Sequence, residues 1–167
     1  MDYFIDFLLL ALIYNIFFYK KWKRELKWAL TIKTLMYLYV VLVLFVTLMP
    51  FTMPFSGMNK GFMETANFIP FRDLRLKYDG AIREIVLNIL MMVPFGFLYP
   101  SITKKGMLKT VVTTLFFSLA IESYQLLSVW WNGIETRIFD VTDLITNTSG
   151  GLIGYLTFVI LRAVVIK

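Results

Sequence analysis

The sequence predicts an all-α membrane protein, a polytopic bundle of about five transmembrane helices that forms a single domain over residues 1–167. Three observations support this prediction. Hydrophobic residues make up 59% of the chain and charged residues only 17%, whereas soluble domains are near half apolar and a quarter charged. The apolar residues gather in runs long enough to cross a bilayer. The lysines and arginines gather in connectors that would share one side of a membrane.

The apolar runs and their flanks set the expected helices. The first run has acidic residues before it and lysines after it, without a small-residue cleavage site, so we expect an uncleaved helix and not a signal peptide. The second run closes at Pro50. The third is interrupted at Pro94 and Gly96 and ends at Pro100, because proline disrupts the helical hydrogen-bond ladder. The expected spans are Tyr3–Tyr19, Leu30–Met49, Ile82–Tyr99, Leu108–Trp130 and Leu144–Leu161.

The charged residues of the connectors predict the orientation. Residues 20–27 are strongly basic, residues 104–109 carry three lysines, and the chain closes on Arg162 and Lys167. The connectors over 50–80 and 131–143 are instead mixed or acidic. Since cytoplasmic loops are enriched in lysine and arginine, the bundle is expected to have its N-terminus outside and its C-terminus inside.

The connector from Pro50 to Gly80 is unusually long and combines prolines and glycines with many phenylalanines. A hydrated linker has no need of so many aromatic rings. We therefore expect an extracellular loop that is partly re-entrant or interfacial and packs on the bundle. Irregular backbone is tolerated at membrane depth only against protein or a wet cavity.

Composition excludes several kinds of chemistry. The chain has neither cysteine nor histidine, which excludes disulfides, thiolate nucleophiles, imidazole bases and zinc sites of the Cys/His type. We predict no cofactor and no resident metal, and a metal would have to use oxygen ligands. The net charge of +6 is attributed to cytoplasmic lysines and arginines rather than to nucleic-acid binding. The sequence gives no oligomeric state.

Polar residues inside the expected spans mark the candidate site, because such residues are costly in a membrane. They all fall in the outer half of the third to fifth spans, which predicts a polar pocket open to the outside. Helical spacing places Glu122 and Gln125 on one face of the fourth span. It also places Asp140, Asp143 and Asn147 on one face of the last helix, if that helix begins near Asp140. Arg137 is the cation in the connector above them. The candidate residues are Asn88, Glu122, Gln125, Arg137, Asp140, Asp143 and Asn147.

A plainer interpretation is available for most of these residues. Asn88 and Gln125 are also suited to interhelical hydrogen bonds. Asp140 and Asp143 are also suited to a helix N-terminus, where the dipole favours carboxylates. Glu122 is harder to explain by packing, since a buried carboxylate needs a cation, a proton or strong donors. Below these residues, Gly150 and Gly154 form a small-xxx-small pair that lets another helix approach closely.

Several segments resemble the VanZ-like family. Residues 67–71 resemble its N-x-x-P-F stretch, and residues 88–98 resemble its N-x-L-x-x-x-P-x-G-x-L helix. Residues 122–154 resemble its E-x-x-Q and R-x-x-D-x-x-D-x-x-x-N-x-x-G-x-x-x-G ending. The resemblance adds Asn67 to the candidate residues. It implies a multi-pass protein of the bacterial cytoplasmic membrane and a phenotypic link to low-level teicoplanin resistance, without a defined reaction.

Three classes of function are compatible with this pattern. The first is a binding or exclusion module for an amphiphile, either a lipoglycopeptide or a lipid-linked cell-wall precursor, with Arg137 holding an anionic group. The second is an intramembrane enzyme that uses the carboxylates for acid–base chemistry or to hold a divalent cation. The third is a small lipid or solute transporter, which is disfavoured because matching halves with broken helices are absent from the pattern. We expect the first, with membrane lipids as further partners and no nucleic acid.

Overall fold

The computed structural model describes residues 3–51, 59–132 and 138–165, and the regular structure of these ranges is helical. Five helices are long and apolar enough to cross a membrane. This confirms the predicted all-α, five-span class. The first span joins α1 (Tyr3–Ile13), a π-helical segment (Tyr14–Tyr19) and α2 (Lys20–Trp22), and the others are α3 (Lys27–Thr47), α5 (Ala81–Thr103), α6 (Met107–Asn132) and α7 (Val141–Val165).

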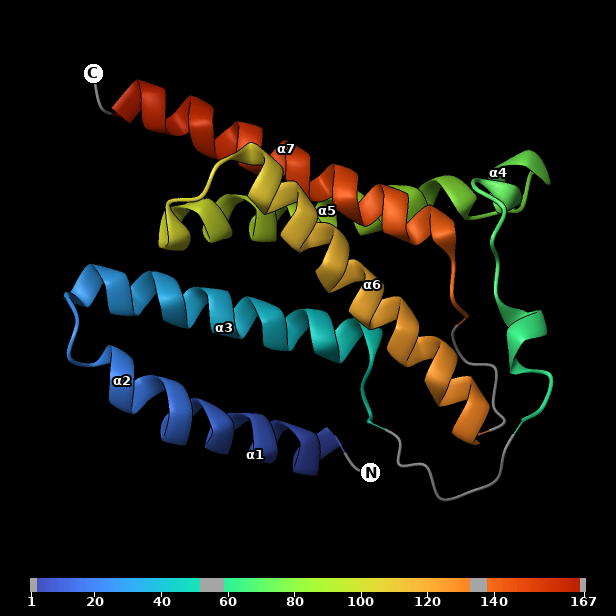
Figure 1. Ribbon diagram of the computed structural model, residues 1–167, viewed down its shortest axis with the longest axis horizontal. Helices are drawn as coiled ribbons and strands as arrows, with labels where there is room; N and C mark the ends of the chain where they lie inside the picture. Colours follow the sequence, from blue (N-terminus) through green and yellow to red (C-terminus); the bar gives the residue numbers. More distant parts are fainter. Residues whose placement is uncertain (1–2, 52–58, 133–137, 166–167) are drawn as a thin grey trace.

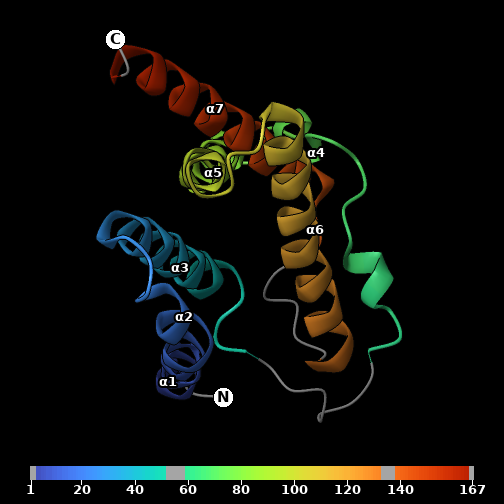
Figure 2. The same cartoon turned by 60° about the vertical axis from the view of Figure 1, so that its left-hand side comes forward.

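The helices lie in layers. In Figure 1 the first span lies along α3, and α5 and α7 lie on the other side of α3, with α6 crossing them at an angle. Figure 2 gives the same order from another side, with α1 and α2 outermost. In the most apolar window of the first two spans, 6% of residues are buried, against 22–33% in the last three. Burial is therefore concentrated in α5, α6 and α7. The apolar core cluster itself joins Val43 of α3, Met92 and Phe95 of α5, and Ile121 of α6.

Glycines set the closest approach in this core. A Cβ atom on Gly150 would overlap the carbonyl oxygen of Ile89, and one on Gly154 would overlap that of Val93. The backbones of α5 and α7 therefore touch along this face. The expected small-xxx-small contact is confirmed, and its partner is α5.

Helix α5 corrects one prediction. It runs without a break through Pro94 and Pro100 to Thr103, whereas the prolines were expected to interrupt and end it. A proline within a helix is tolerated in a membrane when neighbouring groups satisfy the backbone it disturbs. Pro94 leaves the carbonyl of Leu90 without its helical donor. The Tyr39 hydroxyl of α3 donates a hydrogen bond of 2.7 Å to the next carbonyl along the chain, that of Met91.

The described part of the long connector, residues 59–80, packs across one end of the bundle, as expected (Figure 1). It contains a 3-10 turn (Phe62–Thr65) and the short helix α4 (Arg72–Arg75). The backbone amide of Asn59 donates to the carbonyl oxygen of Trp130 at 2.8 Å. The backbone amide of Asn67 donates to the carbonyl oxygen of Phe139 at 2.8 Å. Its depth in a membrane stays a prediction.

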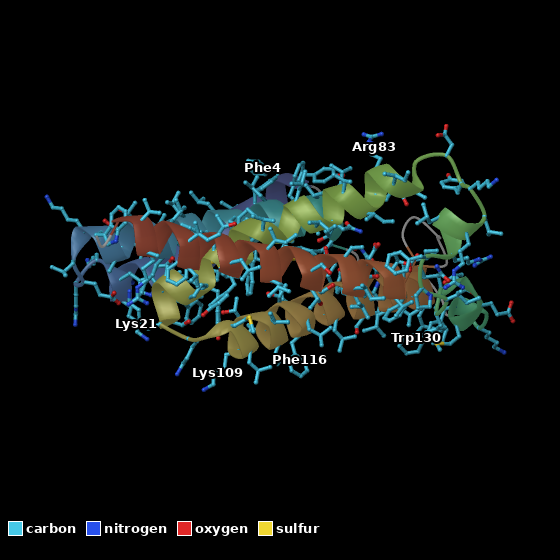
Figure 3. The ribbon with its side chains drawn as sticks, turned by 90° about the horizontal axis from the view of Figure 1, so that it is seen from above. Phe4, Lys21, Arg83, Lys109, Phe116 and Trp130 are labelled. Atoms are coloured by element: carbon cyan, nitrogen blue, oxygen red, sulfur yellow. The ribbon has the colours of Figure 1, made fainter. Side chains whose placement is uncertain are left out.

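The charged connectors identify the two ends of the bundle. Figure 3 shows Lys21 and Lys109 at one end and Arg83 and Trp130 at the other. The connector after the first span and the connector after the third span thus lie at the same end. This is expected when successive spans run in opposite directions. The assignment of that end to the cytoplasm stays a prediction.

Candidate functional site

Polar side chains from α5, α6 and α7 meet near the end of the bundle that carries the long connector. Helix α6 contributes Glu122 and Gln125 one turn apart, and α7 contributes Asp143 and Asn147 one turn apart. These spacings put each pair on one helical face. Glu122 is 2% exposed and Asn147 is 1% exposed, so the site is built into the interior.

Glu122 holds the start of α7 against α6. Its Oε2 atom accepts a hydrogen bond of 3.0 Å from the backbone amide of Asp140. That amide precedes the first turn of α7, where unpaired amide groups need an acceptor. The buried carboxylate therefore has a strong donor, as its position in the membrane requires.

Asp140 begins α7 and ties it to the long connector. Its Oδ1 atom accepts from the amide of Thr142 at 2.6 Å, the bond of a helix N-cap. Its Oδ2 atom accepts from the side-chain amide of Asn67 at 2.8 Å. The backbones of the same two residues pair as an isolated parallel bridge. The plainer interpretation of Asp140 as a helix-terminal acid is thus confirmed, and Asn67 is its partner.

Asp143 and Asn147 face two different helices. The Oδ1 atom of Asp143 accepts from the side-chain amide of Asn88 on α5 at 2.6 Å. The side-chain amide of Asn147 donates to the Ser118 hydroxyl on α6 at 2.9 Å. The Oδ1 atom of Asn147 is buried and has no hydrogen-bond partner among the residues that the structure describes. A buried acceptor left in this state is costly and favours a donor from elsewhere.

Gln125 links the site to α3. Its side-chain amide donates to the carbonyl oxygen of Thr47 at 3.2 Å, at the last residue of α3. An interhelical hydrogen bond is therefore its role here, as the plainer interpretation holds.

A groove of about 880 Å³ runs beside these groups. Its wall from α3 and α5 is mainly apolar and includes Leu42, Val46, Leu87 and Met91. Carboxylates and amides from α4, α5, α6 and α7 also line it, and the residues that the structure describes there include neither lysine nor arginine. The predicted site residues that line it are Asn88, Glu122, Gln125, Asp140, Asp143 and Asn147.

Two predicted residues stand apart from this lining. Asn67 is 3% exposed and lies behind Asp140, so it supports the site without facing the groove. Arg137 lies outside the described residues. Its proposed contacts with the acids therefore stay a prediction.

Several groups at the site were not predicted from the sequence. Tyr39 and Thr47 of α3 line the groove, although the second span carries no diagnostic motif. A tyrosine hydroxyl within an apolar span needs a partner, and this was the available signal for Tyr39. Asp73 and Glu84 add two further acids to the lining. In the described ranges, no group of three or more acidic side chains is arranged to hold a metal ion.

Comparisons with known proteins agree with the resemblance noted in the sequence. The family model described as VanZ/LLP1 matches residues 5–162. A curated relative, "Protein VanZ" of Enterococcus faecium, is 34% identical over 76 residues. That match covers 45% of this chain and 44% of the relative, so it spans less than half of the relative's length. No solved structure matches the chain.

Proposed function

This chain belongs to the VanZ/LLP1 family, and from that premise we propose that it is a binding protein whose groove takes up an amphiphilic ligand of the cell envelope. Five apolar helices and the family place it among multi-pass membrane proteins. We further propose that it resides in the bacterial cytoplasmic membrane, with the groove open toward the outer side.

The observation that carries the proposal is the mixed apolar and polar lining of the groove. Along α3 and α5 it offers Leu42, Val46 and Leu87, which suit an acyl chain. The carboxylates of Glu122 on α6 and Asp143 on α7 line the same groove. Ligand sites are typically apolar with a few convergent polar groups that fix orientation. A molecule with a tail and a polar head would satisfy both kinds of lining together.

The charge of the lining indicates the head group. The described lining residues provide carboxylates and amides, and the buried Oδ1 atom of Asn147 lacks a donor within the described ranges. These groups accept hydrogen bonds from ammonium, amide or hydroxyl donors. A head rich in such donors, as in a sugar or a peptide, is therefore favoured. An anionic group on the same ligand would be held by Arg137 through its planar fork.

Two ligand types carry these features, a lipoglycopeptide of the teicoplanin type and a lipid-linked cell-wall precursor. Holding either at the membrane surface would account for an association with teicoplanin resistance or with envelope maintenance. The arrangement supports binding over intramembrane catalysis, because Glu122 and Asp140 already accept backbone amides and Asp143 accepts the Asn88 amide. Acids that already accept hydrogen bonds within the protein are suited to recognition.

The test is a binding measurement on the purified full chain in lipid nanodiscs. Teicoplanin, its deacylated form and a lipid-linked cell-wall precursor are titrated against wild type. We expect an acylated ligand to bind, and deacylation to weaken teicoplanin binding at least about tenfold through loss of the apolar contact. Failure of both acylated ligands to bind would contradict the proposal.

Two pairs of variants assign the binding to the groove. Glu122→Gln should keep the fold and weaken binding about tenfold, while Glu64→Gln, on an exposed residue of the connector, should leave it unchanged. Leu42→Trp narrows the groove and should weaken binding, while Leu38→Trp, on an exposed α3 residue that does not line it, should not. Equal effects within each pair would place the ligand elsewhere.

A further inference from the structure

A second groove lies at the opposite, basic end of the bundle. It has a volume of about 490 Å³ and shares no lining residue with the first. Phe18 and Trp22 of the first span, Tyr37 and Val40 of α3, and Tyr99 and Ile102 of α5 form its walls. It is therefore a gap between three spans and does not belong to the carboxylate site.

The walls are aromatic and joined to one another. The ring of Phe18 lies 5.0 Å from that of Trp22 and 5.4 Å from that of Tyr37, measured between centroids. The Tyr37 hydroxyl donates to the carbonyl of Leu10 at 2.6 Å, which fixes α3 against α1. Aromatic side chains of this kind are enriched where a span meets the membrane surface. The aromatic walls are thus suited to the depth at which an acyl chain joins its head group.

The mouth of the groove is basic. Lys33 lines it, with its Nζ atom 5.9 Å from the centre of the Trp22 ring. Lys33 also pairs with Glu25 at 2.5 Å, and Glu25 is the one acid among residues 20–33.

Further cations flank this mouth in the sequence. Lys21 and Lys23 lie on either side of Trp22, and Lys104 follows the lining residue Thr103. All three are exposed, and within the described ranges none of them forms an ion pair. Figure 3 shows Lys21 and Lys109 at this same end of the molecule. An apolar gap beneath unpaired lysines is complementary to an acyl chain beneath a phosphate.

We propose that this groove binds an anionic phospholipid, with one acyl chain between α3, α5 and the first span and its phosphate held by Lys21, Lys23 and Lys104. Basic pockets between transmembrane helices recognise anionic head groups in this way. The site is independent of the envelope ligand proposed above, because it uses other residues at the other end of the bundle. It also gives the loosely packed first span a lipid to pack against.

The test uses Trp22 as a reporter within the full chain. Trp28, Trp130 and Trp131 are replaced by Phe, so that fluorescence comes from Trp22 alone. The protein is titrated with brominated phosphatidylglycerol or brominated phosphatidylcholine of the same acyl chains in a neutral detergent. We expect the phosphatidylglycerol to quench Trp22 at an at least about fivefold lower mole fraction.

A matched pair of charge variants assigns the preference to the basic mouth. Lys21→Gln combined with Lys23→Gln and Lys104→Gln should abolish the difference between the two lipids. Lys60→Gln combined with Lys77→Gln and Arg83→Gln, exposed residues at the other end, should preserve it. Native mass spectrometry of the protein with all four tryptophans should show the same lipid preference without altering any aromatic residue.

Three results would overturn the proposal. Equal quenching by both lipids in the Trp22 protein would mean that the groove takes any acyl chain. A preference that survives the loss of Lys21, Lys23 and Lys104 would place the anionic lipid elsewhere. Absence of retained phosphatidylglycerol in native mass spectrometry, with intact protein, would exclude a bound lipid.

Discussion

The stretch of α7 from Asp143 to Gly154 has two halves that hold their neighbours by different means. In the first half, Asp143 and Asn147 make side-chain hydrogen bonds to α5 and α6 over 2.6 and 2.9 Å. In the second half, Gly150 and Gly154 bring the backbone directly onto α5. Side-chain bonds span a gap, and that half borders the groove. Glycine contacts leave no gap between α5 and α7. The same helix therefore lines the groove in one half and packs closely against α5 in the other.

This difference separates function from stability along a single helix. Small residues allow the close packing that drives helix association in lipid. Polar side chains contribute less to association, because the unfolded chain in a membrane also finds partners for them. Substitutions in the glycine half should therefore act on the fold, and substitutions in the polar half should act mainly on binding.

The largest expected effect concerns which end of the bundle, the end at the polar half of α7 or the opposite end, lies outside the membrane. Single cysteines at Lys60 and Lys105, in a chain with no other cysteine, mark the polar and basic ends. An impermeant thiol reagent applied to intact cells should label Lys60→Cys and leave Lys105→Cys unlabelled until the membrane is opened. Equal labelling of both positions would contradict the predicted orientation and the outward opening of the groove.

The next effect is steric. Gly154→Leu inserts a side chain where a single Cβ atom would already overlap Val93 and contact Gly96. We expect a loss of at least about 3 kcal/mol in the free energy of unfolding, because overpacking forces the helices apart. Thermal unfolding in detergent measures it. Ile160→Leu, on a side chain that is 63% exposed, is the control and should change little. Unchanged stability of Gly154→Leu would contradict the close contact of Gly154 with α5.

A smaller effect is expected in the polar half. Asn88→Ala removes the donor to Asp143 and leaves that carboxylate without its amide, which should cost about 1–2 kcal/mol. Asn15→Ala is the control, since Asn15 is exposed and donates only to the Ala11 carbonyl of its own helix. Chemical denaturation in detergent compares the two variants. If Asn88→Ala destabilised the fold as strongly as Gly154→Leu, the contrast between the halves would not hold.

The smallest effect compares two tyrosines of α3. Tyr39→Phe removes the bond to Met91 of α5, and Tyr37→Phe removes the bond to Leu10 of α1. Each should cost about 0.6 kcal/mol, the average for such bonds within membranes. Only Tyr39→Phe should also weaken ligand binding, because only Tyr39 lines the carboxylate groove. Stability from denaturation and affinity from titration separate the two outcomes.

The sequence by itself determined the class, the spans and the grouping of the candidate residues. Apolar length and hydropathy depend on composition along the chain, and helical spacing fixes which side chains share a face. For this reason Asp143 with Asn147, and Gly150 with Gly154, were placed correctly before any contact was known.

The tertiary structure decided which faces meet. The bond from Asn67 to Asp140 joins residues 73 positions apart, and local periodicity carries no information on such a distance. Helix α5 continues through Pro94 and Pro100 to Thr103, which the prolines alone do not reveal. The groove is lined by residues of α3, α5, α6 and α7. Such packing depends on the fit of surfaces from four helices, and no single segment encodes it.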